Sequence, residues 1–222
     1  MIIKEDTINT DYVALENCMN INNSYEEFKN SIFFDLEHYI YKKPICIGVF
    51  GCCYFDESVN SLKVTQYMIE NKNDSIEILY LAKDYFKNMK SKNKKYIVTF
   101  SGNNDFTMIN YLFEKYSIDY KILDNFQEID LQKKYEQIEK SSIGLKSLEK
   151  KFDIERDSEL ISGQNLAKTF SKIMKDSEYF KRMPEEKKEK ILLYNEQDVV
   201  SLFYIFTTWQ KFLGSADISH QH

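Results

Sequence analysis

Two carboxylates stand in the middle of an apolar and aromatic stretch, IFFDLEHYI, at residues 32–40. Asp35 and Glu37 are two positions apart, so in a β-strand both side chains would point to the same face while their neighbours enter the core. Acids placed in this way repel each other unless a cation lies between them, and hard divalent cations prefer such oxygen ligands. The alternative is a strand end with solvated acids, because Asp-x-Glu occurs four times in the chain. The pair alone does not decide between the two.

Three further residues have the chemistry to complete such a site. Asp105 follows the apolar run YIVTF at the start of a predicted helix, where an acid is also favourable with the helix dipole. Tyr194 and Asp198 are four positions apart in a late helical segment, so they are neighbours on one face. The phenol could then reach a water held by a metal bound to Asp198. The alternative is a packed tyrosine beside a solvated acid, because Tyr-x3-Asp also occurs at two other places.

The composition limits the class of protein. With 222 residues, 43% of them hydrophobic, and only two prolines and six glycines, the chain is predicted to bury one sizeable core. It contains no run of about 18 uncharged apolar residues, and its N-terminus lacks the apolar centre of a signal peptide. We therefore expect a soluble, cytoplasmic protein that has no membrane partner. The four cysteines lack zinc-ligand spacing and are predicted to be small core residues in a reducing compartment.

Charge and histidine content exclude other classes. The net charge of −5 argues against a tight, nonspecific nucleic-acid binder, so a polyanion would have to be met locally. The densest basic stretch, KNMKSKNKK at 87–95, is predicted to be a solvated connection between two elements. His38 is the only histidine outside the extreme tail. A serine or cysteine hydrolase that needs a histidine base is therefore not favoured.

The elements that would position the acids follow a consistent order. Residues 1–30 predict loops and one short helix, and then SIFFDLE, ICIGVFGCCYF and LKVTQYMI predict an antiparallel meander. A helix, the buried strand KKYIVTFSG, a second helix and a short strand in YKILDNF or EIDL follow, and helices continue to Gly214. This order predicts an α/β fold: a ribonuclease-H-like mixed five-stranded sheet flanked by helices, with a helical C-terminal part. Such a core places acids at the first strand, near the fourth strand and on a late helix, in the order of Asp35, Asp105 and Asp198.

With these residues assembled, the chain resembles the DEDD class of 3′-to-5′ exonucleases in its tyrosine branch, and more closely the bacterial YprB-like ribonuclease-H-like family. The resemblance extends from about Ile32 to Leu202. The stretches that carry it are FFDLE, IVTFSGNNDF, IDL, GLKSLEKKFDIER, ISG and NEQDVVSL. The second motif departs from the family's Asn-Gly-x-x-Phe-Asp, because Ser101 replaces the Asn and Phe106 follows the shifted Asp105. In GLKSLEKKFDIER, the helical spacing of Leu145, Leu148 and Phe152 predicts a core helix.

The resemblance implies a metal-dependent exonuclease that acts on the 3′ end of a DNA or RNA strand and releases nucleoside monophosphates. Two divalent cations, Mg²⁺ or Mn²⁺, would be bound. Asp35 would bridge both, Glu37 and Asp198 would complete the first metal site, and Asp105 would support the second. Tyr194 would orient the nucleophilic water rather than act as a full base, because an unperturbed phenol has a pKa near 10.

Two alternatives use the same fold. A nucleic-acid-binding module would keep the fold without turnover, which the altered second motif allows. A ribonuclease-H-like endonuclease or junction resolvase would use the same acids without needing Tyr194. We predict an N-terminal extension packed on the core at residues 1–30, the exonuclease domain at 31–214 and a flexible tail at 215–222.

Overall fold

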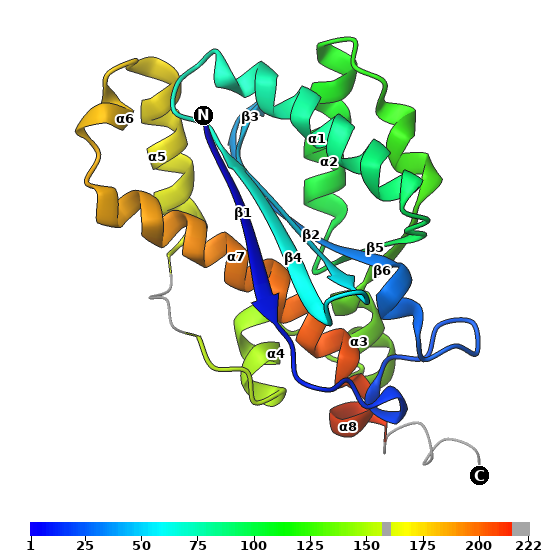
Figure 1. The fold of residues 1–222 in the computed structure, drawn as a ribbon. Helices are drawn as coiled ribbons and strands as arrows, with labels where there is room; N and C mark the ends of the chain where they lie inside the picture. Colours follow the sequence, from blue (N-terminus) through cyan, green and yellow to red (C-terminus); the bar gives the residue numbers. More distant parts are fainter. Residues whose placement is uncertain (157–160, 215–222) are drawn as a thin grey trace.

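The computed structural model describes residues 1–156 and 161–214, which form a mixed β-sheet flanked by helices (Figure 1). The sheet has the order β1-β4-β3-β2-β5-β6. Neighbouring strands are antiparallel from β1 to β2, whereas β2, β5 and β6 are parallel. The strands are β1 (Ile2–Asn9), β2 (Ser31–Tyr41), β3 (Lys43–Asp56), β4 (Ser61–Met68), β5 (Tyr96–Thr99) and β6 (Gln127–Asp130). The predicted α/β architecture with a mixed sheet is confirmed.

The predicted number of five strands is wrong, because the N-terminal segment adds a sixth. Residues 2–9 form β1, which pairs with β4 along its whole length at the edge of the sheet. Along β1 the side chains alternate between half-buried and exposed, but apolar and charged types occur on both sides. The strand is therefore held by backbone pairing at an available edge, which leaves little hydrophobic alternation to detect. The predicted tail at 215–222 lies outside the described residues.

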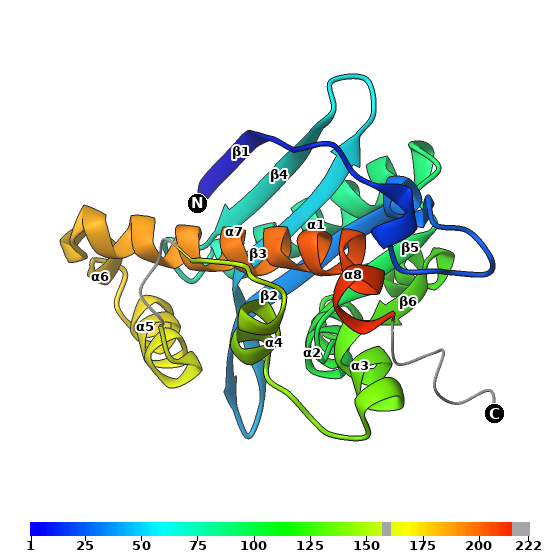
Figure 2. The same ribbon diagram turned by 90° about the horizontal axis from the view of Figure 1, so that it is seen from below.

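Helices cover both faces of the sheet (Figures 1 and 2). The α-helices are α1 (Asp74–Ser91), α2 (Asn103–Lys115), α3 (Leu131–Glu139), α4 (Leu145–Lys151), α5 (Gly163–Lys175), α6 (Tyr179–Arg182), α7 (Glu185–Thr207) and α8 (Trp209–Leu213). Short 3₁₀ turns are η1 (Leu15–Asn17), η2 (Glu27–Asn30) and η3 (Tyr120–Asn125). The last predicted strand is thus in EIDL, and YKILDN is a 3₁₀ turn. None of the helices in the described part of the chain is both long and apolar enough to span a membrane.

Alternate residues of β2 enter two separate buried clusters, one on each face of the sheet. Phe33 packs edge to face on Phe203 and Phe206 of α7, with ring centroids 5.5 and 6.0 Å away. Phe34 packs in the same way on Phe86 of α1, at 5.6 Å. The alternation that buries these rings directs Asp35 and Glu37 toward the α7 side, up to the register shift between Glu37 and His38. The four cysteines are free and buried, as predicted for core residues.

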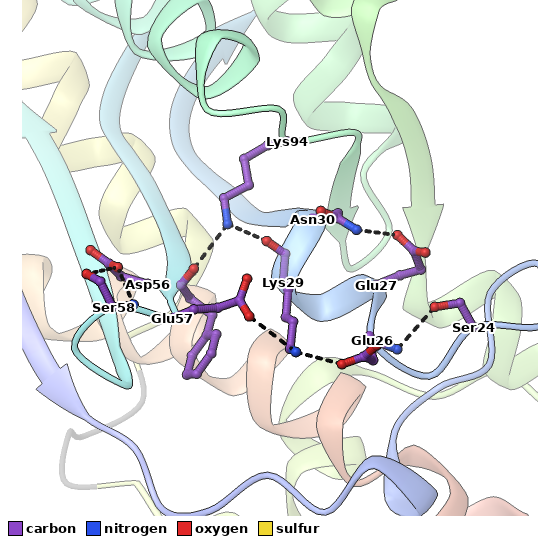
Figure 3. A network of polar contacts seen from close by, with 10 residues as sticks. Ser24, Glu26, Glu27, Lys29, Asn30, Asp56, Glu57, Ser58 and Lys94 are labelled. Carbon is purple, nitrogen blue, oxygen red and sulfur yellow. Dashed lines mark hydrogen bonds and ion pairs between the residues drawn. The ribbon is translucent and has the colours of Figure 1, made fainter.

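The entry to β2 is tied down by a lysine from the basic stretch at 87–95 (Figure 3). The half-buried Lys94 Nζ donates hydrogen bonds to the backbone carbonyls of Lys29 and of Phe55, the latter at 3.0 Å. Burial lowers the pKa of Lys94 to about 8. The prediction of a merely solvated connection is therefore wrong for Lys94, which joins η2 to the end of β3.

Candidate active site

Three of the predicted acids converge where α7 crosses β2. Asp35 and Glu37 project from the same face of β2, and Asp198 reaches them from α7. One carboxylate oxygen from each lies within 4.8 Å of the other two. Asp198 is buried, and the two strand acids are half-buried. Three hard oxygen donors at this spacing suit Mg²⁺ or Mn²⁺, so the residues present fit the cation that the sequence predicts.

Without a cation, ionising these three neighbouring carboxyl groups is energetically unfavourable. Burial, followed by the charge of Asp198, raises the pKa of Asp35 to about 7. Burial and then the charge of Asp35 raise the pKa of Glu37. Burial also raises the pKa of Asp198, although Lys146 and Arg156 oppose that change. A divalent cation among the three carboxylates would relieve the repulsion between them.

A chain of buried hydrogen bonds positions Asp35. Asn195, which is fully buried on α7, donates from Nδ2 to Asp35 Oδ2 at 3.0 Å. Gln66 Nε2 donates to Asn195 Oδ1 at 2.9 Å and to the backbone carbonyl of Leu192 at 2.8 Å. Gly51 pairs with Asp35 across the sheet, and a Cβ atom there would lie only 2.0 Å from Asn195 Oδ1. The absent side chain at Gly51 thus makes room for the amide that orients Asp35.

Asp105 lies at the same end of the sheet but outside the three-carboxylate group. It stands in the first turn of α2 and is 7% exposed, so it does not point into solvent as a simple helix-end acid would. Burial, then the charge of Asp35 and that of Asp130, raise its pKa. The His38 imidazole lies beside it, with Nδ1 3.9 Å from Asp105 Oδ1, and burial lowers the pKa of His38, so this neighbour is neutral at pH 7. Its role as a metal ligand remains a prediction.

The altered second motif forms a tight turn that depends on Asp130. Ser101 has a left-handed backbone with φ of 57°, and its amide donates to Asp130 Oδ1 at 3.0 Å. The same carboxylate oxygen accepts from the Gln132 amide at 3.0 Å at the start of α3. A Cβ atom at Gly102 would lie 2.3 Å from Thr99 Oγ1, so glycine permits the close approach of this turn to β5. Asp130 was part of the quoted IDL stretch, but the sequence did not indicate this supporting role.

Tyr194 lies on α7 one turn before Asp198, as the i, i+4 spacing predicts. Its side chain is half-buried, and burial followed by the charges of Asp198 and Glu37 raises its pKa. The phenol therefore stays protonated at neutral pH, and it is suited to orienting a water rather than removing its proton. Lys146 Nζ lies 4.5 Å from the centre of the Tyr194 ring.

Two basic side chains that were not among the predicted site residues contact the acidic cluster. Lys146 Nζ and Arg156 Nη2 both donate to Asp198 Oδ1. Arg156 is held in turn by Glu149, which is 2% exposed and accepts from Arg156 Nε at 2.7 Å. Leu148 is buried as expected of a core helix. The prediction for this segment used only its apolar spacing, and no local signal distinguishes Lys146 and Arg156 from solvated residues beside such a pattern.

Comparison with known families agrees with this architecture. The family model described as RNase_H superfamily matches residues 32–210. The chain belongs to the RNase_H superfamily. No curated protein and no solved structure gives a significant match.

Membership in the RNase_H superfamily indicates a nuclease-type function, because this superfamily generally hydrolyses nucleic acids. Divalent metals are usual for the fold, and the three-carboxylate group of Asp35, Glu37 and Asp198 is a candidate site for one. The ribonuclease-H-like part of the predicted resemblance is therefore confirmed. The matched range contains all five predicted site residues, from the first strand acid to the late helix.

Proposed function

We propose that the protein is a two-metal-ion 3′-to-5′ exonuclease similar to the YprB-like family in the tyrosine branch of the DEDD class. It would hydrolyse phosphodiester bonds at the 3′ end of a DNA or RNA strand and release nucleoside monophosphates. The observation that carries the proposal is the convergence of Asp35, Glu37 and Asp198 within 4.8 Å, with Tyr194 one helical turn from Asp198. An endonuclease would use the acids but has no evident use for the tyrosine.

Some of the proposed site residues would bind cations, and others would position the reacting groups. Asp35, Glu37 and Asp198 would hold the first divalent cation, and Asp35 would share a second with Asp105. When bound, two such ions supply a hydroxide at neutral pH and stabilise the attacking and leaving oxygens. Asn195 holds the carboxylate of Asp35 in one orientation through its hydrogen bond.

Tyr194 would act on the attacking water. Because its raised pKa keeps the hydroxyl proton in place, the phenol can donate one hydrogen bond and accept another. This fixes the direction of a water without taking its proton. Such a site contacts the sugar-phosphate backbone of the nucleic acid, so we expect low specificity for the nucleotide sequence. The exonuclease domain would extend over residues 31–214.

The test is product analysis with end-labelled oligonucleotides. Single-stranded and double-stranded DNA and RNA, labelled at the 5′ end, are incubated with the protein and Mn²⁺ or Mg²⁺. A ladder that shortens from the 3′ end, with nucleoside monophosphates as the product, would support the proposal. The control variants are Asp35→Asn, which should be inactive, and Asp84→Asn, which removes the same charge from an exposed position on α1 and should stay active.

Other outcomes assign the remaining alternatives. Internal cuts that depend on Asp35 would favour a ribonuclease-H-like endonuclease or resolvase. Retained binding without cleavage under any metal would favour a degenerate nucleic-acid-binding module. Cleavage that survives in Asp35→Asn would overturn the site assignment, because no other group of three metal-ligating acids at this spacing occurs in the described part of the chain.

A further inference from the structure

Two basic side chains donate hydrogen bonds to one carboxylate oxygen of Asp198, a residue that the proposed metal site needs. Lys146, on α4, and Arg156, just beyond that helix, both donate to Asp198 Oδ1, where α4 lies beside α7 (Figure 2). Each carries a positive charge that would repel a divalent cation at Asp198. At the same time these charges oppose the rise in the pKa of Asp198, so they stabilise its ionised form. Lys146 and Arg156 therefore take part of the role of a metal in the metal-free protein.

Their surroundings give the two cations different freedom to move. Arg156 has a side chain that is 9% exposed, and Glu149 accepts hydrogen bonds from two of its nitrogens. Lys146 has a side chain that is 26% exposed, and it contacts the Asp198 carboxylate and the Tyr194 ring. Arg156 is thus anchored by a buried partner. Lys146 is a flexible point charge that can leave Asp198 for another anion.

Arg156 also has an unused donor. Its Nη1 is buried and has no hydrogen-bond partner among the described residues. A buried donor without a partner is unfavourable, so an oxyanion that accepts from it would be stabilising. The guanidinium fork matches phosphate oxygens, and an ammonium group binds them as a point charge. Lys146 and Arg156 together offer both kinds of donor beside the acidic cluster.

We propose that Lys146 and Arg156 form a phosphate-binding site, in which Lys146 holds Asp198 in the metal-free protein and moves to a phosphate oxygen of the nucleic-acid strand once divalent cations bind. The inference rests on the proposed function, because the phosphate belongs to the strand that the site would cleave. Lys146 then competes with the metal before the substrate arrives and assists binding of the substrate afterwards.

This exchange predicts opposite changes in two affinities. In Lys146→Met without nucleic acid, the affinity for Mn²⁺ should rise by about threefold to tenfold, because one repelling charge is removed. With Ca²⁺ as the cation, the affinity for a single-stranded oligonucleotide should fall by about tenfold. Its dependence on salt should also weaken by about one released counterion. Mn²⁺ binding is measured by electron paramagnetic resonance, and oligonucleotide binding by fluorescence anisotropy over a salt series.

Two further variants make the test specific. Lys150→Met removes the same charge from an exposed position on α4 and should change neither affinity. Lys146→Arg keeps the charge and should retain most of the oligonucleotide affinity. If Lys146→Met weakened both affinities, its role would be structural and the inference would be wrong.

The outcome can be separated from that of the proposed function. If the wild-type protein cleaves strands from the 3′ end and Lys146→Met binds Mn²⁺ and oligonucleotide like Lys150→Met, only the phosphate site is overturned. If the wild-type protein neither binds nor cleaves any strand, the proposed function fails and the phosphate role fails with it.

Discussion

Replacing Asp35 with Asn should stabilise the metal-free protein, although it removes the proposed central metal ligand. Asn has nearly the same shape, and its side-chain oxygen can still accept the hydrogen bond that Asn195 donates to Asp35. What the variant loses is a charge, whose burial near Asp198 raises the pKa of Asp35 from the ordinary value of 3.8 to about 7. The folded protein therefore holds this proton to a higher pH than the unfolded chain does.

The sign and size of the effect follow from that difference. Between about pH 4 and pH 7 the folded state binds more protons than the unfolded state, so the wild-type protein loses stability as the pH rises, and the loss is complete above pH 7. The difference between a pKa of 3.8 and a pKa of about 7 corresponds to at most about 4 kcal/mol of unfolding free energy. Part of the raised pKa reflects repulsion among several acids, so removing one charge does not recover all of this energy. We therefore expect the unfolding free energy of Asp35→Asn to exceed that of the wild-type protein by about 2–4 kcal/mol at pH 8. At pH 4.5 the gain should fall to about a quarter of that.

Urea unfolding followed by circular dichroism measures this directly. Wild type, Asp35→Asn and the control Asp84→Asn are compared at pH 4.5 and pH 8 in EDTA, and again at pH 8 with Mn²⁺. Mn²⁺ should stabilise the wild-type protein and narrow its difference from Asp35→Asn, because only the wild type keeps the full set of ligands. An Asp35→Asn variant that is no more stable than wild type at pH 8 in EDTA would refute the reasoning. It would mean that the neighbouring cations already neutralise the cluster.

Three more variants test separate parts of the structure. Tyr194→Phe keeps the packing and should lower the cleavage rate by about tenfold to a thousandfold in single-turnover assays; an unchanged rate would favour the endonuclease alternative. Asp105→Asn should raise the Mn²⁺ concentration needed for half-maximal cleavage by more than about tenfold, because hard cations are held mainly by carboxylate charge; an unchanged Mn²⁺ titration would remove it from the site. Burial lowers the pKa of Lys94 to about 8, so the wild-type protein should gain about 1–2 kcal/mol of stability between pH 7 and pH 10 relative to Lys94→Met. Urea unfolding checks this, and the exposed Lys95→Met should behave like wild type.

Local periodicity was enough to predict most of the elements and the relative placement of neighbouring site residues. The alternation in β2 places Asp35 and Glu37 on one face, and the helical spacing of α7 places Tyr194 one turn from Asp198. These relations hold within one element, so they can be read without knowing how the elements pack. The order of strands and helices then indicated which elements would meet.

The parts that were missed depend on contacts between distant segments. Lys146 and Arg156 meet Asp198 across 52 and 42 positions of the chain, and Gln66 meets Asn195 across 129. A charged residue beside an apolar helical pattern is usually solvated, so its type alone did not indicate these contacts. The exact placement of Asp105 was also undecided, because it depends on a turn held by a residue from another strand.

Removing the edge strand β1 would expose the backbone of β4. The family match begins at residue 32, whereas residues 2–9 pair with β4 along its whole length. A chain cut to the matched range would leave the amides and carbonyls of β4 open to any passing strand, and such bare edges promote self-association and aggregation. In the whole chain β1 covers this edge, and its charged side chains, among them Lys4, Glu5 and Asp6, disfavour pairing with another strand. Because Gln66 lies on β4, the same cut would also loosen the strand that supports Asn195.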